Sequence, residues 1–504
     1  MSRTGADEVR DAVLDRGSFL SWDAAPLAVP TSDAYAAELM AARAASGRDE
    51  AVLTGEGRIN GRRVAVIASD FDFLGGSIGV AAAERITAAV QRATAERLPL
   101  LASPSSGGTR MQEGTVAFLQ MVKIAAAVEL HKRAHLPYLV YLRHPTTGGV
   151  FASWGSLGHV TLAEPGALVG FLGPRVYEQL YGAPFPPGVQ TAENLQAYGV
   201  IDGVIPLKWL RRTCSRALKV MLDDPGPARA QPALKPAPVP IPDIAAWASV
   251  CASRRPDRPG VGFLLRHGAT ERVFLSGTGS TERGATILLA LARFDGQPTV
   301  VLGQLRGADR LTDPVALRDA RRGMALAAGL RLPLVLVIDT PGPALSVEAE
   351  QGGLAAQIAA CLAELVTLEV PTVSVLLGQG SGGPALAMVP ADRVLAALHG
   401  WLAPLPPEGA SAIVYRDTEH APELSAAQGI RSADLQAHGI VDVIVGEHPD
   451  AAQEPIDFAK RMSRAIAVEL SALRGVPAEQ RMAARLERYR RIGLPNPAET
   501  DVSQ

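Results

Sequence analysis

Two pairs of adjacent glycines, Gly148-Gly149 and Gly382-Gly383, are the residues of this sequence best suited to do chemistry. Each pair follows an apolar run and precedes small residues that can begin a helix. Without a Cβ, such a pair lets backbone N–H groups approach a ligand closely, and the start of a helix favours negative charge. These are the requirements of an oxyanion hole, in which donors face an oxygen on which charge develops. We therefore take all four glycines as candidate catalytic residues.

Each pair has a companion turn one expected strand earlier in the chain. The first turn contains Gly107, Gly108, Thr109 and Arg110, and the second contains Gly342 after Asp339-Thr340-Pro341. Amides in these turns could grip the same oxygen from its other side. Arg110 could contact a CoA phosphate or pair with a local carboxylate. Because glycines also serve simply to permit tight turns, the common register of all four turns is what favours a binding role.

That register is an offset of 234 residues. Gly108 and Gly342 are 234 residues apart, and Arg97-Leu98-Pro99-Leu100 recurs at the same offset as Arg331-Leu332-Pro333-Leu334. The segment 195–202 returns, with conservative changes, as 435–442. A constant offset over this length predicts two copies of one domain. Two similar pairs of turns could then act on two similar oxygens.

Strands and helices alternate around these turns, as the parallel strands and helical crossovers of an α/β fold require. Residues 8–45 are expected to be largely helical, and a hairpin is expected to turn at Gly55-Glu56-Gly57 before a strand at 63–69. The other expected elements are helices at 77–97, 111–134, 244–254 and 461–493, and strands at 98–103, 136–142, 299–302, 334–338 and 372–377.

A proline-dense stretch separates the two copies. Residues 223–243 include Pro236, Pro238, Pro240 and Pro242, a pattern typical of a semi-extended linker. The sequence therefore predicts an N-terminal domain at 1–222 and a C-terminal domain at 244–504.

Composition excludes several classes of protein. The formal net charge of −2 offers no basic field for nucleic acid. The N-terminus has no apolar core of a signal peptide, and no apolar run reaches the ~20 residues that span a bilayer. The three cysteines, at 214, 251 and 361, form no CxxC pair. We expect a cytoplasmic protein that binds neither membrane nor nucleic acid.

Two further groupings could carry chemistry, and each has a structural alternative. His131 and His135 have a spacing that can bind zinc, but they flank Lys132-Arg133 at the end of an expected helix, where cations are favourable. Glu113 and Glu164 could be the acid pair of a hydratase, or could serve structure alone. We favour the structural alternative in both cases and expect no metal site.

With the glycine turns in place, the whole chain resembles a known family. Its N-terminal half resembles the β subunit of bacterial acetyl-CoA carboxylase carboxyltransferase, and its C-terminal half resembles the α subunit, fused in that order. The similar segments are residues 54–61, 70–79, 106–114, 145–150 and 170–176 in the first half and 338–342, 380–383 and 407–411 in the second.

The resemblance implies two tandem crotonase-like (ClpP/crotonase) domains, each a β-β-α superhelix. It implies transfer of a carboxyl group from carboxybiotin, held on a separate carrier protein, to acetyl-CoA or propionyl-CoA. Gly148 and Gly149, helped by the turn at Gly108 and Thr109, would hold the thioester oxygen. Gly382 and Gly383 would hold the ureido oxygen of biotin. The implied partners are a biotin carboxylase, a biotin carboxyl carrier protein and at least one further copy of this chain.

Three departures from the family pattern bear on these expectations. The cysteine zinc ribbon of the β subunit is missing, so no structural zinc is expected. Pro343 and Pro384 adjoin the second pair of turns, and a proline has no N–H to donate. An alignment shifted by one residue would place Pro384 in a donor position. Two alternatives therefore stay open: a malonyl- or methylmalonyl-CoA decarboxylase or transcarboxylase, and a catalytically degenerate paralogue that binds acyl-CoA.

Overall fold

The structure, a computed structural model, describes residues 3–29, 31–226, 242–275, 286–307 and 310–494. The chain divides into two compact units, Met1–Met221 and Leu222–Gln504. Most of the expected linker, residues 227–241, lies outside the described residues. Each unit is described by itself below.

Unit 1 is built on a seven-stranded sheet in the order β1-β2-β3-β4-β5-β7-β9. The strands β1, β2 and β3 are antiparallel, and those from β3 onward are parallel. A small parallel pair, β6 and β8, stands apart from this sheet. The strands are β1 (Leu20–Ser21), β2 (Val52–Ile59), β3 (Arg62–Ser69), β4 (Leu100–Ser103), β5 (Tyr138–Leu142), β6 (Thr146–Thr147), β7 (Val160–Ala163), β8 (Val169–Gly170) and β9 (Gly203–Val204).

Unit 2 repeats this plan with an eight-stranded sheet. Its main path is β10-β11-β12-β13-β14-β15-β17, with β16 paired to the end of β14. The first three strands are again antiparallel and the rest parallel. The strands are β10 (Ala269–Leu275), β11 (Ile287–Phe294), β12 (Gln297–Gln304), β13 (Leu334–Thr340), β14 (Thr372–Ser381), β15 (Arg393–Ala397), β16 (Trp401–Ala403) and β17 (Val443–Val445).

Equivalent hydrogen bonds show that the two units share one backbone plan. The N–H of Leu98 donates to the Ala93 carbonyl at 2.8 Å, and that of Leu332 donates to the Ala327 carbonyl at 2.9 Å. Arg97 and Arg331, in the same turns, both have a positive φ, of 53° and 52°. The 234-residue offset is therefore a structural register.

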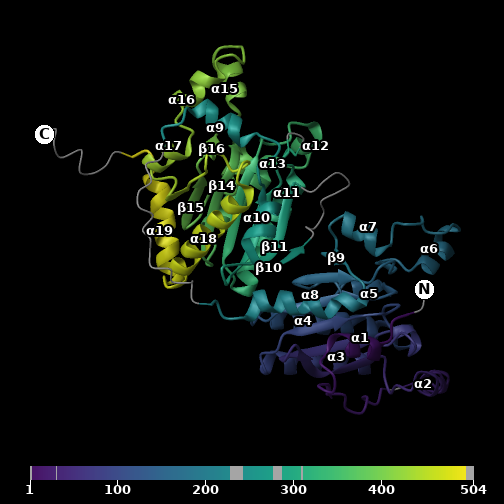
Figure 1. Ribbon diagram of the computed structural model, residues 1–504. Helices are drawn as coiled ribbons and strands as arrows, with labels where there is room; N and C mark the ends of the chain where they lie inside the picture. The colour runs from purple at the N-terminus through teal and green to yellow at the C-terminus, as the bar shows by residue number, and fades with distance from the viewer. Residues whose placement is uncertain (1–2, 30, 227–241, 276–285, 308–309, 495–504) are drawn as a thin grey trace. The chain divides into compact units, whose positions relative to one another are not determined.

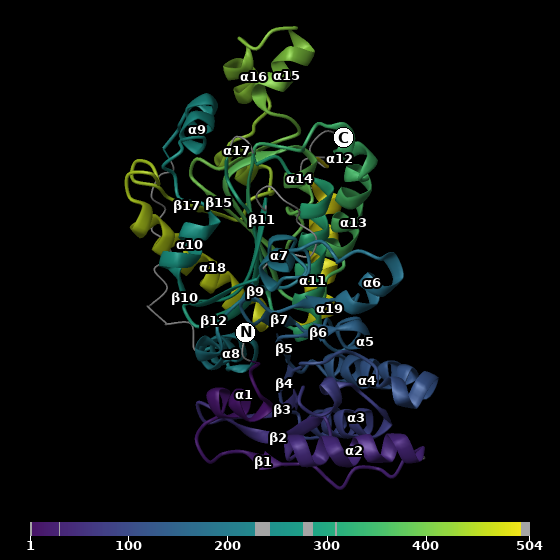
Figure 2. The ribbon, with the colours of Figure 1, turned by 90° about the vertical axis from the view of Figure 1, so that its right-hand side faces the viewer.

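Helices cover both faces of each sheet. In unit 1, α3 and α4 pack with the strands into one core, and α1 contacts β2 and β3 from the other side (Figure 2). In unit 2, α10 and α18 contribute to the core on one face, and α11 packs on the opposite face (Figure 1). The helices of unit 1 are α1 (Ala6–Val13), α2 (Asp33–Ser46), α3 (Val80–Ala95), α4 (Gly114–Arg133), α5 (Gly148–Phe151), α6 (Pro174–Tyr181), α7 (Ala192–Ala197) and α8 (Leu207–Leu222).

The helices of unit 2 end in a pair, α18 and α19, where a helix over 461–493 was expected. They are α9 (Ala246–Ser253), α10 (Val261–Gly268), α11 (Pro314–Leu330), α12 (Val347–Gln351), α13 (Leu354–Val366), α14 (Gly382–Leu386), α15 (Pro407–Val414), α16 (Ala421–Ala427), α17 (Ser432–Ala437), α18 (Pro455–Arg474) and α19 (Ala478–Arg491). Within the described ranges, no helix is both long and apolar enough to cross a membrane.

One expected turn is wrong. The first hairpin turns at Asn60-Gly61, where φ is 50° and 84°, and Gly55 and Gly57 lie inside β2. A Cβ on Gly55 would stand 2.5 Å from the ring of Phe19, and one on Gly57 would stand 2.5 Å from Leu14. These glycines are therefore places where an adjoining segment packs directly on the strand. An Asn-Gly pair is the stronger hairpin signal because both residues adopt a positive φ readily.

Candidate active site

The two glycine turns of unit 1 lie against each other at the carboxyl ends of β4 and β5. We call residues 104–110 the first loop and residues 145–149 the second loop of unit 1. A Cβ built on Gly108 would lie 3.5 Å from the Thr147 carbonyl oxygen and 3.6 Å from the Gly149 nitrogen. The structure therefore brings the candidate residues of the two turns together, as expected of an oxyanion hole with donors from two segments.

Only some of the expected amides are free to bind a ligand. The N–H of Gly148, where φ is 64°, donates to the Phe171 carbonyl at 3.1 Å. The amide of Gly107 donates to the Gly75 carbonyl at 2.9 Å, and that of Gly108 to the Ser106 hydroxyl at 3.0 Å.

Two candidate donors remain in unit 1. Gly149 lies in the first turn of α5, where an amide has no partner within the helix. Among the described residues, no hydrogen-bond acceptor is found for the amides of Gly149 and Thr109. The local geometry thus reduces the expected set of donors to the amides of Thr109 and Gly149.

Arg110 does not extend towards solvent. Its side chain is 1% exposed and forms a bidentate ion pair with Glu50, with one bond of 3.1 Å. It also donates to the Tyr35 hydroxyl at 3.3 Å and the Ser77 carbonyl at 2.8 Å. The local carboxylate, rather than a CoA phosphate, is the partner seen here. Arg110 therefore anchors the end of the first loop to Glu50, Tyr35 and Ser77.

A second buried arginine, which the sequence analysis did not single out, supports both loops of unit 1. Arg143 is fully buried at the end of β5 and donates to the Ser69 carbonyl at the end of β3. It also donates to the Ser103 carbonyl at 2.7 Å and hydroxyl at 2.9 Å, at the end of β4. Burial lowers the pKa of Arg143 to about 10. An arginine placed directly after an apolar run is the sequence signal that could have revealed it.

The glycine turns of unit 2 have the same arrangement. We call residues 338–344 the first loop and residues 378–383 the second loop of unit 2. Helix α14 begins at Gly382, where φ is 68°, as α5 begins at Gly148. A Cβ on Gly342 would lie 3.5 Å from the Ser381 hydroxyl oxygen, so these two loops also lie side by side.

The equivalent starts of α5 and α14 show which residue of unit 1 corresponds to Pro384. Pro384 is the third residue of α14 and corresponds to Val150, so Gly383 corresponds to Gly149 and keeps its N–H. Among the described residues, no acceptor is found for the Gly383 amide. A Cβ on Gly383 would stand 2.6 Å from the Cδ1 atom of Ile358, so a larger residue would require that side chain to move. The proline therefore leaves the equivalent amide in place and gives no support to a degenerate site.

Two polar residues hold the loops of unit 2: Asp339, which belongs to the expected turn, and Gln304, which was not among the sequence candidates. Gln304, at the end of β12, donates to the Pro384 carbonyl at 3.0 Å and accepts from the Asp339 amide at 3.2 Å. The Asp339 side chain is buried, accepts from the Gln379 amide at 3.1 Å and lies 3.5 Å from Arg306. Burial raises the pKa of Asp339. These contacts join three neighbouring strand ends to the start of α14.

The acid pair and the zinc pair considered from the sequence are engaged elsewhere. Glu113 accepts from the Tyr35 hydroxyl at 2.5 Å and the Val80 amide at 2.6 Å, and Glu164 accepts from the Thr4 hydroxyl at 2.5 Å. His131 is buried and contacts Thr94 at 2.9 Å. Throughout the described ranges, no group of three or more histidine, cysteine or acidic side chains could hold a metal ion.

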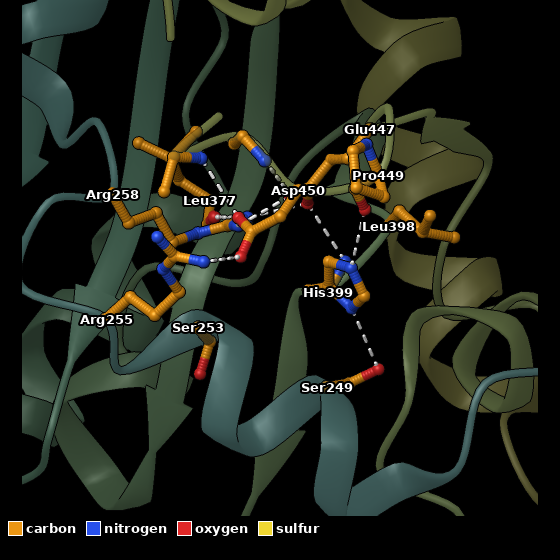
Figure 3. A network of polar contacts seen from close by, with 12 residues as sticks. Ser249, Ser253, Arg255, Arg258, Leu377, Leu398, His399, Glu447, Pro449 and Asp450 are labelled. Carbon is orange, nitrogen blue, oxygen red and sulfur yellow. Dashed lines mark hydrogen bonds and ion pairs between the residues drawn. The ribbon is translucent and has the colours of Figure 1, made fainter. Parts of the chain in front are cut away.

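A buried network in unit 2 contains a serine next to a histidine (Figure 3). The Ser249 hydroxyl lies 3.3 Å from Nδ1 of His399, whose Nε2 lies 3.2 Å from the Pro449 carbonyl. The same network includes Arg258, which pairs with Glu447 at 2.5 Å. Ser249 and His399 are both buried. The network fixes α9 to the ends of β14 and β15 rather than presenting a nucleophile.

Comparisons with known proteins identify the family of this chain. The carboxyl transferase domain family matches residues 12–483. A probable biotin-dependent acyl-coenzyme A carboxylase beta3 subunit of Mycobacterium tuberculosis is 74% identical over 498 residues, which cover 98% of this chain and all of that protein. The acetyl-coenzyme A carboxylase carboxyl transferase subunits beta/alpha of Salinispora arenicola are 36% identical, over 98% of this chain and 91% of that protein.

Among solved structures, transcarboxylase 12S has a TM-score of 0.75 at 20% identity, covering 94% of this chain and 89% of that one. This similarity confirms the expected fold of two crotonase-like α/β domains. Family, chain coverage and loop geometry agree, and the chain belongs to the carboxyl transferase family.

Proposed function

We propose that this chain is the carboxyltransferase component of a biotin-dependent acyl-CoA carboxylase. One observation carries the proposal: two structurally equivalent pairs of loops each present an amide that has no acceptor among the described residues, at Gly149 and at Gly383. Carboxyl transfer between biotin and an acyl-CoA has two carbonyl-type oxygens that gain negative charge. One loop pair for each oxygen explains why the domain occurs twice.

The residues of each unit then have a defined task. In unit 1, the amides of Thr109 and Gly149 hold the thioester oxygen while the enolate forms. In unit 2, the amide of Gly383 holds the ureido oxygen. Carboxybiotin supplies the carboxyl group, and the biotin left behind can take the α-proton of the acyl group. A side-chain base is not needed, in keeping with the structural bonds of Glu113 and Glu164.

The substrates and partners follow from the same proposal. We infer that the acceptor is acetyl-CoA or propionyl-CoA, giving malonyl-CoA or methylmalonyl-CoA as precursors of fatty acids or polyketides. The biotin arrives on a carrier protein that a biotin carboxylase loads in an ATP-dependent step, in the cytoplasm. The name of the 74% identical relative, a probable biotin-dependent acyl-coenzyme A carboxylase beta3 subunit, supports the use of biotin and of an acyl-CoA.

We also infer a homo-oligomer of at least two chains. Helix α4 leaves Phe118, Leu119 and Val122 61%, 56% and 66% exposed along one face. Clustered apolar side chains on a surface helix are typical of a subunit contact. Sedimentation velocity of the purified protein would test this inference, and a monomer at micromolar concentration would contradict it.

Carboxyl transfer can be tested in the reverse direction with free biotin. The purified protein is incubated with malonyl-CoA or methylmalonyl-CoA, and the formation of acetyl-CoA or propionyl-CoA is measured with and without biotin. We expect product only when biotin is present. Product without biotin would identify a decarboxylase instead, and no product with any short acyl-CoA in either direction would overturn the proposal.

A further inference from the structure

The first loop of unit 2 has the same hydrogen bonds as that of unit 1 but a different residue at its donor position. In unit 1, Ile78 receives a bond at its carbonyl from the Arg110 amide (3.0 Å) and donates to the Gly108 carbonyl (2.9 Å). In unit 2, Thr312 receives a bond from the Ala344 amide (2.9 Å) and donates to the Gly342 carbonyl (3.1 Å). The residue between each pair of bonded positions is Thr109 in unit 1 and Pro343 in unit 2.

This equivalence means that unit 2 lacks one donor. The amide of Thr109 has no acceptor among the described residues, whereas Pro343 has no N–H at all. The Gly383 amide is then the only backbone donor of unit 2 that corresponds to the two in unit 1. An oxygen that gains charge in this site would be held by one amide instead of two.

A buried hydroxyl lies beside the first loop of unit 2. Ser381 is fully buried, and its hydroxyl oxygen has no hydrogen-bond partner in the described part of the chain. It faces the first loop, since a Cβ on Gly342 would be 3.5 Å from the hydroxyl oxygen and 3.9 Å from the Ser381 Cβ. Burying a hydroxyl without a partner destabilises a protein, so a native example calls for an explanation.

The matching residue of unit 1 uses its hydroxyl in a hydrogen bond within the protein, and Ser381 does not. Thr147 corresponds to Ser381, and its hydroxyl donates to the Ser106 carbonyl at 3.4 Å. Ser381 makes no such bond, although its neighbour Thr340 corresponds to Ser106 and, like Ser106, accepts a bond from a loop amide, that of Gly342. The hydroxyl is therefore available in the unit whose loop has lost an amide, and engaged in the other.

We propose that the Ser381 hydroxyl is a catalytic hydrogen-bond donor that takes the place of the missing amide at position 343. This inference rests on the proposed function, because it assigns the donor to the ureido oxygen of biotin. The hydroxyl keeps its proton and donates only a hydrogen bond, so no bond to Ser381 forms or breaks. Two donors, the Gly383 amide and the Ser381 hydroxyl, then face one oxygen.

The test compares the wild-type protein with Ser381→Ala in the biotin-dependent reverse reaction. We expect kcat to fall by about 100- to 1,000-fold, the range for loss of one oxyanion donor, with a change of less than about threefold in the KM for biotin. The Tm should stay the same or rise, because the variant removes a buried polar group that has no protein partner. Pro343→Ala restores an N–H, and the double variant should recover most of the lost kcat.

Ser374→Ala is the matched control. Ser374 is another buried serine of β14, but its hydroxyl donates to the Met388 carbonyl at 2.8 Å, away from the loops. We expect this variant to lower the Tm and to leave kcat unchanged, the opposite pattern to Ser381→Ala.

The outcomes distinguish failure of the Ser381 inference from failure of the proposed function. Wild-type kcat in Ser381→Ala would overturn this inference alone, as would a lowered kcat that comes with a lowered Tm and is not restored by Pro343→Ala. A wild-type protein without biotin-dependent transfer would overturn the proposed function and this inference with it.

Discussion

At the scale of single residues, the amides of the unit 1 loops divide into those that already donate a hydrogen bond within the protein and those that do not. Gly148 and Gly108, the most conspicuous glycines in the sequence, donate their amide hydrogens to the Phe171 carbonyl and the Ser106 hydroxyl. Their contribution is a positive φ, of 64° and 113°, that turns the chain. The candidate donors are their neighbours Gly149 and Thr109. A glycine motif thus marks the site, while the proposed donors lie one residue further on.

The role of Thr109 can be tested by copying the residue that unit 2 has at the same position. Thr109→Pro removes the amide at a position where the equivalent loop already contains Pro343. We expect kcat in the biotin-dependent reaction to fall by about 100- to 1,000-fold because one oxyanion donor is lost. The Tm, measured by calorimetry, should fall by only a few degrees.

Thr109→Ala is the control, since it keeps the amide and removes only the side chain. It should retain kcat within about threefold of the wild-type value. If Thr109→Pro were as active as Thr109→Ala, the amide would have no part in the reaction.

A second prediction at this scale concerns stability in acid. His131 is fully buried, and desolvation lowers its pKa to about 4. Its folded pKa is thus below the ordinary value of about 6.5, so its contribution to stability is complete above pH 6.5 and is lost as the pH falls towards 4. At pH 5 this loss amounts to about 2 kcal/mol.

The corresponding measurement is the difference in Tm between pH 7 and pH 5. We expect His131→Gln to make this difference smaller than in the wild type, although the variant is less stable at pH 7 because it loses the contact with Thr94. His438→Gln, at an exposed position, should leave the difference unchanged. An equal pH dependence in the wild type and His131→Gln would contradict the prediction.

At the scale of elements, close packing decides which helical glycines are needed. A Cβ on Gly323, in α11, would stand 2.6 Å from Leu302 and 3.0 Å from Leu289 of the sheet. Gly262, in α10, has nothing within 4 Å of the same position. We expect Gly323→Ala to lower the free energy of unfolding of unit 2 by about 1–3 kcal/mol through overpacking. Gly262→Ala should raise it by up to about 1 kcal/mol through helix propensity.

Denaturant titration of the two variants, followed by circular dichroism, would compare these effects. Stabilisation by Gly323→Ala would show that α11 can move away from β11 and β12 without loss, contrary to the packing described above.

Much of this element-scale order could be predicted from the sequence. The apolar runs at 98–103, 136–142 and 334–338 became β4, β5 and β13, because buried parallel strands are apolar throughout. The hairpin turn could not be placed from Gly55 and Gly57. These positions need glycine because Phe19 and Leu14, far away in the sequence, pack directly against them. The roles of Arg143 and Gln304 were likewise hidden, since each depends on which strand ends lie side by side.

At the scale of the whole molecule, each compact unit has its own core. Leu100 of β4 and Leu334 of β13 are equivalent, fully buried residues. Each leucine-to-alanine change should lower the free energy of unfolding of its own unit by about 2–5 kcal/mol. We therefore expect Leu100→Ala and Leu334→Ala to shift different transitions in scanning calorimetry. A single transition that both variants shift equally would show that the units unfold together.

In terms of exchange between the copies, the proline at 343 makes the two units different. After a domain duplicates, either copy can in principle be replaced by the other, provided that both rely on the same donors. Pro343 ends that equivalence, since a loop that carries it needs a hydroxyl at position 381, whereas the loop with Thr109 does not. The two loops are therefore no longer interchangeable: a loop with the unit 1 residue at position 343 would bring its own amide, and the Ser381 hydroxyl would become dispensable.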